Sequence, residues 1–244
     1  MKKEYHSWHS PILSITMPVV SYGHWGPPLL MFPTAAADCE EYERFGLIDS
    51  IAHHIEAGKV KVFSIDSINR HSWMNSNLHP AERARRQSLF DAYVYQEVAP
   101  FIWDSCRSPG IAICTTGASF GAFHALNTLL RHPDRYKLTI AMSGAYELKT
   151  YCDGYYDDNV YFNNPGDYLP NLNDSFLLDQ LRQCGIHILT GHGSYEAPEH
   201  SRRISGLLAA KGIPYNLDVW GYDWPHDWPT WKVMLDHYIG KLFY

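Results

Sequence analysis

Residues 110–130 read GIAICTTGASFGAFHALNTLL, and Ser119 stands between the two glycines of a G-x-S-x-G pattern. The apolar run 110–117 is typical of a buried strand, and the run after Gly121 has the composition of a helix. A serine on a tight strand-to-helix turn is held in a strained conformation, with its hydroxyl clear of the sheet. A glycine-rich bend that only allows close packing is the alternative. The strand-turn-helix context favours a nucleophile over that alternative.

The rest of the chain alternates between strand-like and helix-like stretches. Besides 110–117, strands are predicted at 1–20, 28–34, 59–66, 137–144, 186–191 and 215–222. Besides the helix after Ser119, helices are predicted at 38–58, 80–104, 199–212 and 229–243. Strands that alternate with helices imply an α/β fold, with a mostly parallel central sheet and helices on both faces. Chemistry then collects at the carboxyl ends of the strands.

The first two predicted helices carry features that locate their ends. The apolar face of the helix 38–58 is formed, at helical spacing, by Phe45, Ile48, Ala52 and Ile55. Gly58 should end this helix. Pro100 should kink or interrupt the helix 80–104, because proline has no N–H to donate to the preceding turn.

The segment 150–174, TYCDGYYDDNVYFNNPGDYLPNLND, interrupts this alternation. It is long, polar and aromatic, without clear periodicity, and a loop of this length inside a domain is either functional or disordered. Its tyrosines and phenylalanines favour an ordered, cap-like excursion that borders a substrate pocket. Its acidic residues do not have the spacing of a calcium-binding loop. We expect the whole chain, 1–244, to form one domain.

Composition excludes several classes of function. The chain has 244 residues, 45% of them hydrophobic, and a formal net charge of -6, which argues against a nucleic-acid surface. The N-terminal apolar run is broken by serines and prolines, so we expect neither a secretory signal nor a membrane span. The five cysteines form no CxxC pair and fit reduced thiols in a cytoplasmic protein. Aromatic residues are frequent enough to serve a pocket or a contact in a homo-oligomer.

A serine nucleophile needs a base, and the candidate is His226 in GYDWPHDWPTW, 221–231. Of the fourteen histidines, it alone lies in the loop between the last predicted strand and the last predicted helix. That loop lies at the carboxyl edge of the sheet. A neutral imidazole there can take the Ser119 proton and return it to a leaving group.

The base needs a carboxylate to fix its tautomer, in the chain order serine, acid, histidine. The loop after the strand 186–191 reads GHGSYEAPEH and offers Glu196 first. Glu199 is the rival, although it is better placed to begin the next helix. The further alternatives are Asp218, Asp223 and Asp227, the last of which is adjacent to His226 and badly placed to reach the far ring nitrogen. We predict Glu196 as the acid.

Two backbone N–H groups should stabilise the oxyanion that forms on attack. One belongs to Phe120, the residue after the nucleophile, and the other to the loop after the strand 28–34. In that loop Pro33 has no N–H, so Thr34 or Ala35 must donate. We predict Ala35, because small side chains there let the backbone approach a substrate oxygen.

Three stretches resemble the α/β-hydrolases of the putative esterase family, the group that includes esterase D and the feruloyl esterases. They are GASFG at 117–121, LLMFPTAAA at 29–37 and GYDWPHDWPTW at 221–231, and YFNNPGDYLPNL at 161–172 is similar to a segment of short bacterial members. The resemblance covers nearly the whole chain. It implies an α/β-hydrolase fold, with Ser119 as nucleophile and His226 as base. The chain departs from the family in lacking an HG-type oxyanion loop and in offering glutamate as the acid.

The resulting interpretation is a serine esterase that cleaves a small-molecule carboxylic ester through an acyl-enzyme, without cofactor or metal. The residues His6, His9, His53 and His54 form no zinc motif and are expected at the surface. An acyltransferase with the same triad is one alternative, and a non-catalytic binding protein on the same fold is another.

Overall fold

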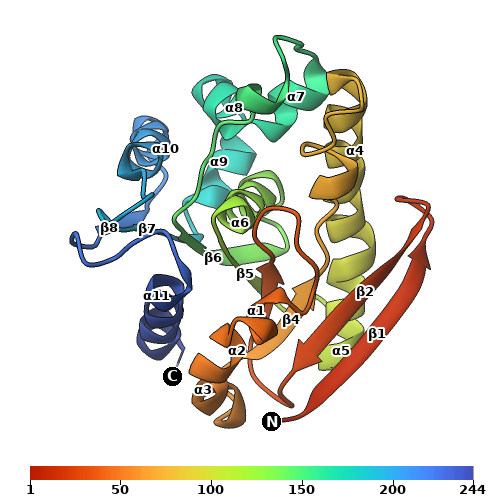
Figure 1. Cartoon of the computed structure of the whole chain (residues 1–244), viewed down its shortest axis with the longest axis vertical. Helices are drawn as coiled ribbons and strands as arrows, with labels where there is room; N and C mark the ends of the chain where they lie inside the picture. Colours follow the sequence, from red (N-terminus) through yellow and green to blue (C-terminus); the bar gives the residue numbers. More distant parts are fainter. Residues whose placement is uncertain (244) are drawn as a thin grey trace.

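A computed structural model describes residues 1–243, which form an eight-stranded sheet in the order β1-β2-β4-β3-β5-β6-β7-β8 (Figure 1). The pairs β1/β2 and β2/β4 are antiparallel, and the remaining pairs β4/β3, β3/β5, β5/β6, β6/β7 and β7/β8 are parallel. The strands are β1 (Lys3–Ser10), β2 (Ile15–Tyr22), β3 (Pro28–Phe32), β4 (Lys61–Ile65), β5 (Ile113–Ala118), β6 (Tyr136–Met142), β7 (Gly185–Thr190) and β8 (Asn216–Val219). The predicted mostly parallel sheet is confirmed.

Helices cover both faces of this sheet, and each face has its own apolar core. In β3, Leu30 and Phe32 contribute to one core and Leu29 and Met31 to the other, as the alternation of side chains along a strand requires. Figure 1 shows α10 and α11 on opposite sides of the sheet. The helices are α1 (Glu41–Arg44), α2 (Leu47–Ser50), α3 (Ala52–Glu56), η1 (Asn69–His71), α4 (Pro80–Tyr93), η2 (Val94–Val98), α5 (Ala99–Cys106), α6 (Phe120–Arg131), η3 (Lys149–Tyr151), α7 (Asp158–Asn163), α8 (Pro165–Asn171), α9 (Ser175–Leu181), α10 (Pro198–Ala210) and α11 (Trp228–Leu242).

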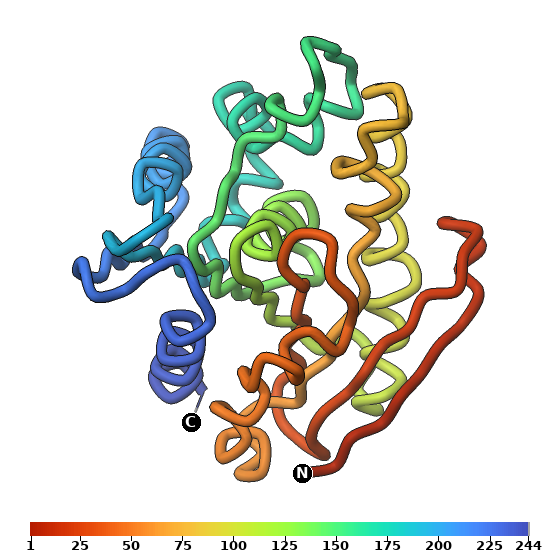
Figure 2. The backbone as a smooth tube through the Cα atoms, in the orientation of Figure 1, coloured from red at the N-terminus to blue at the C-terminus, as the bar shows by residue number. Residues whose placement is uncertain are grey.

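The prediction of one N-terminal strand is wrong, because residues 3–22 form the hairpin β1–β2. Ser14, which has a φ of +57°, donates its N–H to the Ser10 carbonyl at 2.8 Å and closes the turn. The hairpin lies along α4, η2 and α5 (Figure 2). Glu97 in η2 fixes it there by accepting hydrogen bonds from Trp8 Nε1 at 2.6 Å and Ser10 Oγ at 2.7 Å.

The predicted helix 38–58 is broken into α1, α2 and α3. Gly46, between α1 and α2, adopts a φ of +72°, which a continuous right-handed helix does not allow. Ile48 and Ile55 are buried as predicted. Phe45 is 48% exposed instead of buried, and its ring stacks on Trp228 with centroids 4.3 Å apart.

The interruption predicted at Pro100 is confirmed. The helix 80–104 consists of α4 and α5 joined by a turn of π-helix, η2, and Pro100 lies at the start of α5. A π-helical turn is wider than an α-helical one and accommodates a residue that cannot donate the i→i−4 hydrogen bond.

The segment 150–174 is ordered, and it contains the short helices α7 and α8 that its sequence did not indicate. The Asp157 side chain caps α7 by accepting a hydrogen bond from Val160 N–H at 2.9 Å. The Asn159 and Asn163 side chains both hydrogen-bond to Ser88 Oγ on α4, at 2.9 and 3.0 Å. These polar contacts hold α7 against α4.

Two glycines let β3, β5 and α6 approach one another. A Cβ at Gly121 would lie 2.2 Å from the Phe32 carbonyl oxygen, and a Cβ at Gly117 would lie 2.4 Å from the Gly121 carbonyl carbon. Both distances are far inside van der Waals contact, so neither position tolerates a side chain without a backbone shift. These contacts fix the turn at residues 118–120 against the end of β3.

We therefore expect Gly121→Ala to lower the free energy of unfolding by about 1–3 kcal/mol, through overpacking against a backbone that cannot move freely. Gly206→Ala is the matched control, because a Cβ there meets nothing within 4 Å and the position lies inside α10. The control should be neutral or stabilising by up to about 1 kcal/mol. Chemical denaturation measures both variants, and equal stabilities would contradict the close approach.

Candidate functional site

Ser119 lies at the turn between β5 and α6 with a φ of +56° and a ψ of −121°. This region is unfavourable for a residue with a Cβ, so the backbone at Ser119 is strained. The Ser119 N–H donates to the Met142 carbonyl at 2.9 Å, and its carbonyl accepts from Ala122 N–H at 3.1 Å. These bonds hold the strained turn, which presents the hydroxyl at the carboxyl edge of the sheet.

His226 lies between β8 and α11, as predicted, and its Nε2 is 3.0 Å from Ser119 Oγ. Its backbone N–H donates to the Ser194 carbonyl at 2.9 Å, which ties the histidine loop to the loop after β7. The edge of its ring meets Trp231 at a centroid distance of 5.0 Å and an angle of 86°. The serine and the imidazole, 107 residues apart in the chain, are within hydrogen-bonding distance.

Glu196 lies on the far side of this imidazole, with only 1% of its side chain exposed. Its Oε2 is 3.7 Å from His226 Nδ1, which is slightly longer than a hydrogen bond. Thr190 Oγ1 donates to the same carboxylate at 2.9 Å, and Ser143 Oγ donates to the other oxygen. Burial raises the pKa of Glu196, but His226, Ser143 and Thr190 outweigh burial and hold the pKa below its ordinary value of 4.5. The carboxylate is therefore ionised at neutral pH.

The other predicted acids do not contact His226 within residues 1–243. Glu199 is exposed in the first turn of α10, and the Asp227 side chain caps α11 by accepting from Trp228 N–H at 2.7 Å. Asp218 accepts from Trp220 Nε1 and from the Tyr238 hydroxyl, both at 3.0 Å. Asp223 is exposed.

Ser143 and Trp231 belong to the site, although the sequence did not single them out for it. Trp231 Nε1 donates to Ser143 Oγ at 3.0 Å, and Ser143 Oγ in turn donates to Glu196. Ser143 has a φ of +53° directly after β6. Its place at the carboxyl end of a central strand is the one sequence signal that could have indicated it.

The loop after β3 is held by hydrogen bonds to a residue of α1. Thr34 donates both its N–H, at 2.8 Å, and its hydroxyl, at 2.6 Å, to the buried carboxylate of Glu41. Of the two N–H groups that the sequence left open for an oxyanion, that of Thr34 is therefore engaged. In the part of the chain that the structure describes, the N–H groups of Ala35 and Phe120 donate to no protein acceptor.

Tyr42, next to Glu41, joins the same loop to the serine turn. Its hydroxyl donates to the Phe32 carbonyl at 2.7 Å and accepts from Ala118 N–H at 2.9 Å. The residue is fully buried, and burial raises the pKa of its phenol, which therefore remains protonated and able to donate. One hydroxyl thus sets the spacing between the end of β3 and the residue before Ser119.

A second set of contacts holds Ala35 from the opposite side. The Asn69 side chain donates to the Ala35 carbonyl and meets His124 Nε2 at 3.2 Å through its own oxygen. Burial lowers the pKa of His124 to about 3, so this ring on α6 is neutral and donates. The Ala35 peptide is therefore tied to α6, the helix that begins directly after Ser119.

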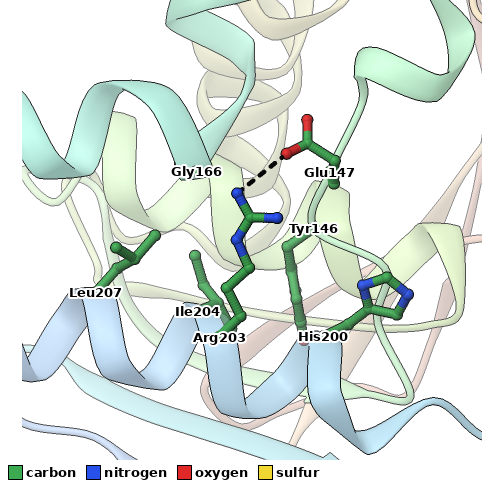
Figure 3. Close-up of a pocket in the computed structure, with 7 residues that line it drawn as sticks. All are labelled: Tyr146, Glu147, Gly166, His200, Arg203, Ile204 and Leu207. Carbon is green, nitrogen blue, oxygen red and sulfur yellow. Dashed lines mark ion pairs between the residues drawn. The ribbon is translucent and has the colours of Figure 1, made fainter.

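A small pocket lies beside the acid loop, between α10 and the segment after β6 (Figure 3). In Figure 3 the Arg203 side chain points to Glu147, and the two form an ion pair of 3.5 Å. The pocket volume is about 10 Å³, which is room for one water molecule and no more. It is too small to receive part of a substrate.

The segment 150–174 meets the site through Tyr151, whose ring edge contacts Phe120 at a centroid distance of 5.5 Å. Farther along, Tyr161, Phe162 and Tyr168 line a separate groove of about 500 Å³ beside the C-terminal end of α6. Neither Ser119 nor His226 lines that groove.

Among residues 1–243, no helix combines the length and the apolar character that crossing a membrane requires.

Comparison with known proteins identifies the family of this chain. The model of the family described as "Putative esterase" matches residues 36–242, which is most of the chain. No curated protein matches the sequence.

Solved structures resemble the chain over nearly its whole length. A ferulic acid esterase superposes with a TM-score of 0.76 at 15% identity, over 99% of this chain and 99% of that one. An S-formylglutathione hydrolase from Agrobacterium tumefaciens gives 0.72 at 13% identity, over 98% and 93%. FphF, a fluorophosphonate-binding serine hydrolase of Staphylococcus aureus, gives 0.69 at 15% identity, over 98% and 97%. At such identities the similarity establishes the fold alone, and the predicted α/β-hydrolase fold is confirmed.

The lowered pKa of Glu196 predicts a pH-dependent contribution to stability. A carboxyl whose pKa is lower in the folded than in the unfolded state stabilises the fold above its unfolded pKa, and this stabilisation is lost as the pH falls through the folded value. The excess stability of the wild type over Glu196→Gln should therefore be greatest above about pH 5 and should shrink as the pH falls below 4.5. Glu199→Gln, at an exposed site, should follow the wild-type profile. Denaturation at a series of pH values tests this, and a constant difference for Glu196→Gln would contradict it.

Proposed function

The chain belongs to the putative esterase family and is a serine ester hydrolase, and we propose that Ser119, His226 and Glu196 are its catalytic triad. We propose further that the N–H groups of Phe120 and Ala35 form its oxyanion hole. The observation that carries this proposal is the 3.0 Å contact between His226 Nε2 and Ser119 Oγ, at a serine whose backbone is strained. Strain of this kind persists only where the surroundings enforce it, and it concentrates at functional sites.

The first step is attack of Ser119 Oγ on the ester carbonyl carbon. His226 Nε2 accepts the hydroxyl proton as the new C–O bond forms, and the imidazole becomes positively charged. The Glu196 carboxylate, which is ionised and almost wholly buried, stabilises that charge and keeps Nδ1 protonated. The present 3.7 Å between Nδ1 and Oε2 has to shorten by less than 1 Å for a full hydrogen bond, as is usual when a substrate binds.

The oxyanion of the tetrahedral intermediate then needs donors that are already in place. Phe120 N–H lies at the N-terminus of α6, where the helix dipole adds positive potential. Within residues 1–243 Ala35 N–H donates to no acceptor, whereas Glu41 engages the N–H of Thr34. Each such donor is worth on the order of 3 kcal/mol of transition-state stabilisation.

Collapse of this intermediate expels the alcohol, which takes the proton from His226 and leaves the acyl group on Ser119. Water, activated by the same imidazole, attacks the acyl-enzyme and releases the acid. We propose water as the acceptor and a small-molecule ester as the substrate, with Tyr151 and Phe120 bordering the bound acyl or alcohol group. The predictions of a single domain and of a cytoplasmic location stay predictions.

Replacing the two reacting side chains tests the proposal. Ser119→Ala and His226→Ala should each lower kcat for p-nitrophenyl acetate by on the order of 10⁴- to 10⁶-fold, because each removes a group that acts only with the other. His192→Ala is the matched control, since this histidine lies on the acid loop and contacts Arg202 at 3.2 Å rather than the triad. Retention of the wild-type rate by folded Ser119→Ala, or an equal loss in His192→Ala, would contradict the assignment.

Removing the Tyr42 hydroxyl tests how the oxyanion hole is positioned. Tyr42→Phe leaves Ala118 N–H and Phe32 C=O buried and unpaired, at a cost of about 1–3 kcal/mol each in stability. We expect kcat to fall about tenfold to hundredfold, less than for outright loss of an oxyanion donor, while KM stays unchanged. Tyr93→Phe is the control: it removes a buried hydroxyl that has no hydrogen-bond partner among residues 1–243, so kcat should be unaffected. Equal kcat values for the two variants would contradict the role of Tyr42.

A further inference from the structure

A second cluster of functional side chains lies at the contact between α3 and α11. It consists of His53 and His54 on α3 and Asp236 on α11, and one ligand atom of each lies within 4.8 Å of the others. Asp236 is nine residues beyond the Asp227 cap, which places it about 13 Å along α11 from the end that adjoins His226. The cluster is therefore separate from the triad.

We propose that His53, His54 and Asp236 bind a first-row divalent cation, with Zn²⁺ preferred. Two imidazoles and one carboxylate are a donor set that Zn²⁺ commonly takes from proteins, and three protein ligands leave a fourth position for water. Because the His53-His54 pair forms no zinc motif, the sequence predicts both residues at the surface, which is correct for His53 and wrong for the buried His54. Asp236, 182 positions beyond His54, supplies the third ligand through the fold.

The distances within the cluster fit tetrahedral coordination. Asp236 Oδ1 lies 3.4 Å from His53 Nε2 and 3.2 Å from His54 Nε2. Ligands bonded to Zn²⁺ at 2.0–2.1 Å in a tetrahedron stand about 3.3–3.4 Å apart, whereas octahedral neighbours at the same bond length stand about 3.0 Å apart. Two of the three ligand–ligand distances therefore match a tetrahedral site, and all three ligand atoms lie within 4.8 Å of one another, so small adjustments of the side chains close the site around an ion.

The carboxylate of Asp236 also points to a missing partner. Asp236 Oδ1 is buried and accepts no hydrogen bond within the described residues, which is costly for a carboxylate oxygen. His54 Nε2 faces the Asp236 backbone carbonyl at 3.1 Å as well. On metal binding, the ring turns away from this carbonyl, its proton moves from Nε2 to Nδ1, and the Nε2 lone pair takes the metal. The imidazole stays neutral throughout.

The three side chains differ in their exposure to solvent. The His54 side chain is only 9% exposed, whereas those of His53 and Asp236 are 63% and 42% exposed. The buried imidazole fixes one ligand in place, and the exposed ones leave a path from solvent and a face for the bound water.

A cation at this point would tie α3 to α11. The α1–α3 segment supplies Glu41 and Tyr42 under the oxyanion loop, and α11 begins directly after His226. A ligand that binds only the folded state stabilises that state by mass action. We therefore expect the ion to raise the melting temperature without contributing to the chemical step.

Zn²⁺ titration of the metal-free protein tests this proposal. We expect one Zn²⁺ per chain and a melting temperature that rises with Zn²⁺ concentration. Asp236→Asn and His54→Gln should each raise the dissociation constant for Zn²⁺ by at least about tenfold, since loss of even an outer-sphere partner has such an effect. Both variants should also abolish the rise in melting temperature. The exposed His53→Gln provides the same test if His54→Gln does not fold.

His237→Gln is the matched control, because it removes an exposed histidine at the adjacent position of α11 that is no member of the cluster. It should bind Zn²⁺ as the wild type does. Co²⁺ bound in place of Zn²⁺ should give the intense visible absorption of a four-coordinate complex. Wild-type affinity in Asp236→Asn and His53→Gln, loss of binding in His237→Gln, or a weakly absorbing six-coordinate Co²⁺ complex would each overturn the proposal.

Discussion

The strained turn at Ser119 depends on a backbone contact that only glycine permits. Gly121 lies so close to the Phe32 carbonyl that no Cβ fits between them, and Gly117 lies equally close to Gly121. These contacts force β5 to turn sharply into α6, which leaves Ser119 with a φ of +56° and its hydroxyl at the edge of the sheet. The energy of that conformation is offset by the surrounding core, because Phe120 and Ala118 are buried on opposite faces of the sheet. The chemistry of the site begins with this local geometry.

The parallel sheet brings the other groups to the same edge, and small polar links then fix their distances. Glycines also let the acid loop and the histidine loop meet, since a Cβ at Gly191 would lie 2.0 Å from the Trp224 carbonyl oxygen. The Ser143 hydroxyl hydrogen-bonds to both Trp231 and Glu196 and so fixes the distance between them. The Tyr42 hydroxyl likewise hydrogen-bonds to the end of β3 and to the serine turn. Each link is a single hydroxyl that joins two elements.

Sequence patterns predicted the elements whose signals are local. The strand-turn-helix around Ser119 and the loop position of His226 were readable because each lies within one continuous stretch. The hairpin β1–β2 was missed, since its turn depends on Ser14 at a φ of +57°. The breaks in 38–58 depend likewise on the conformation of Gly46. Ser143 was not assigned, because its role arises from contacts with residues 53 and 88 positions away and only its place at the end of a central strand hints at it.

Reaction of the folded protein with a fluorophosphonate, followed by mass-spectrometric mapping of the modified peptide, tests most directly whether Ser119 is the nucleophile. Such a reagent modifies a serine only where a base removes its proton and donors stabilise the oxyanion. The geometry predicts one adduct per chain on Ser119 and none when His226 is replaced by alanine. An adduct on another residue, or an unmodified wild type that is demonstrably folded, would contradict the account.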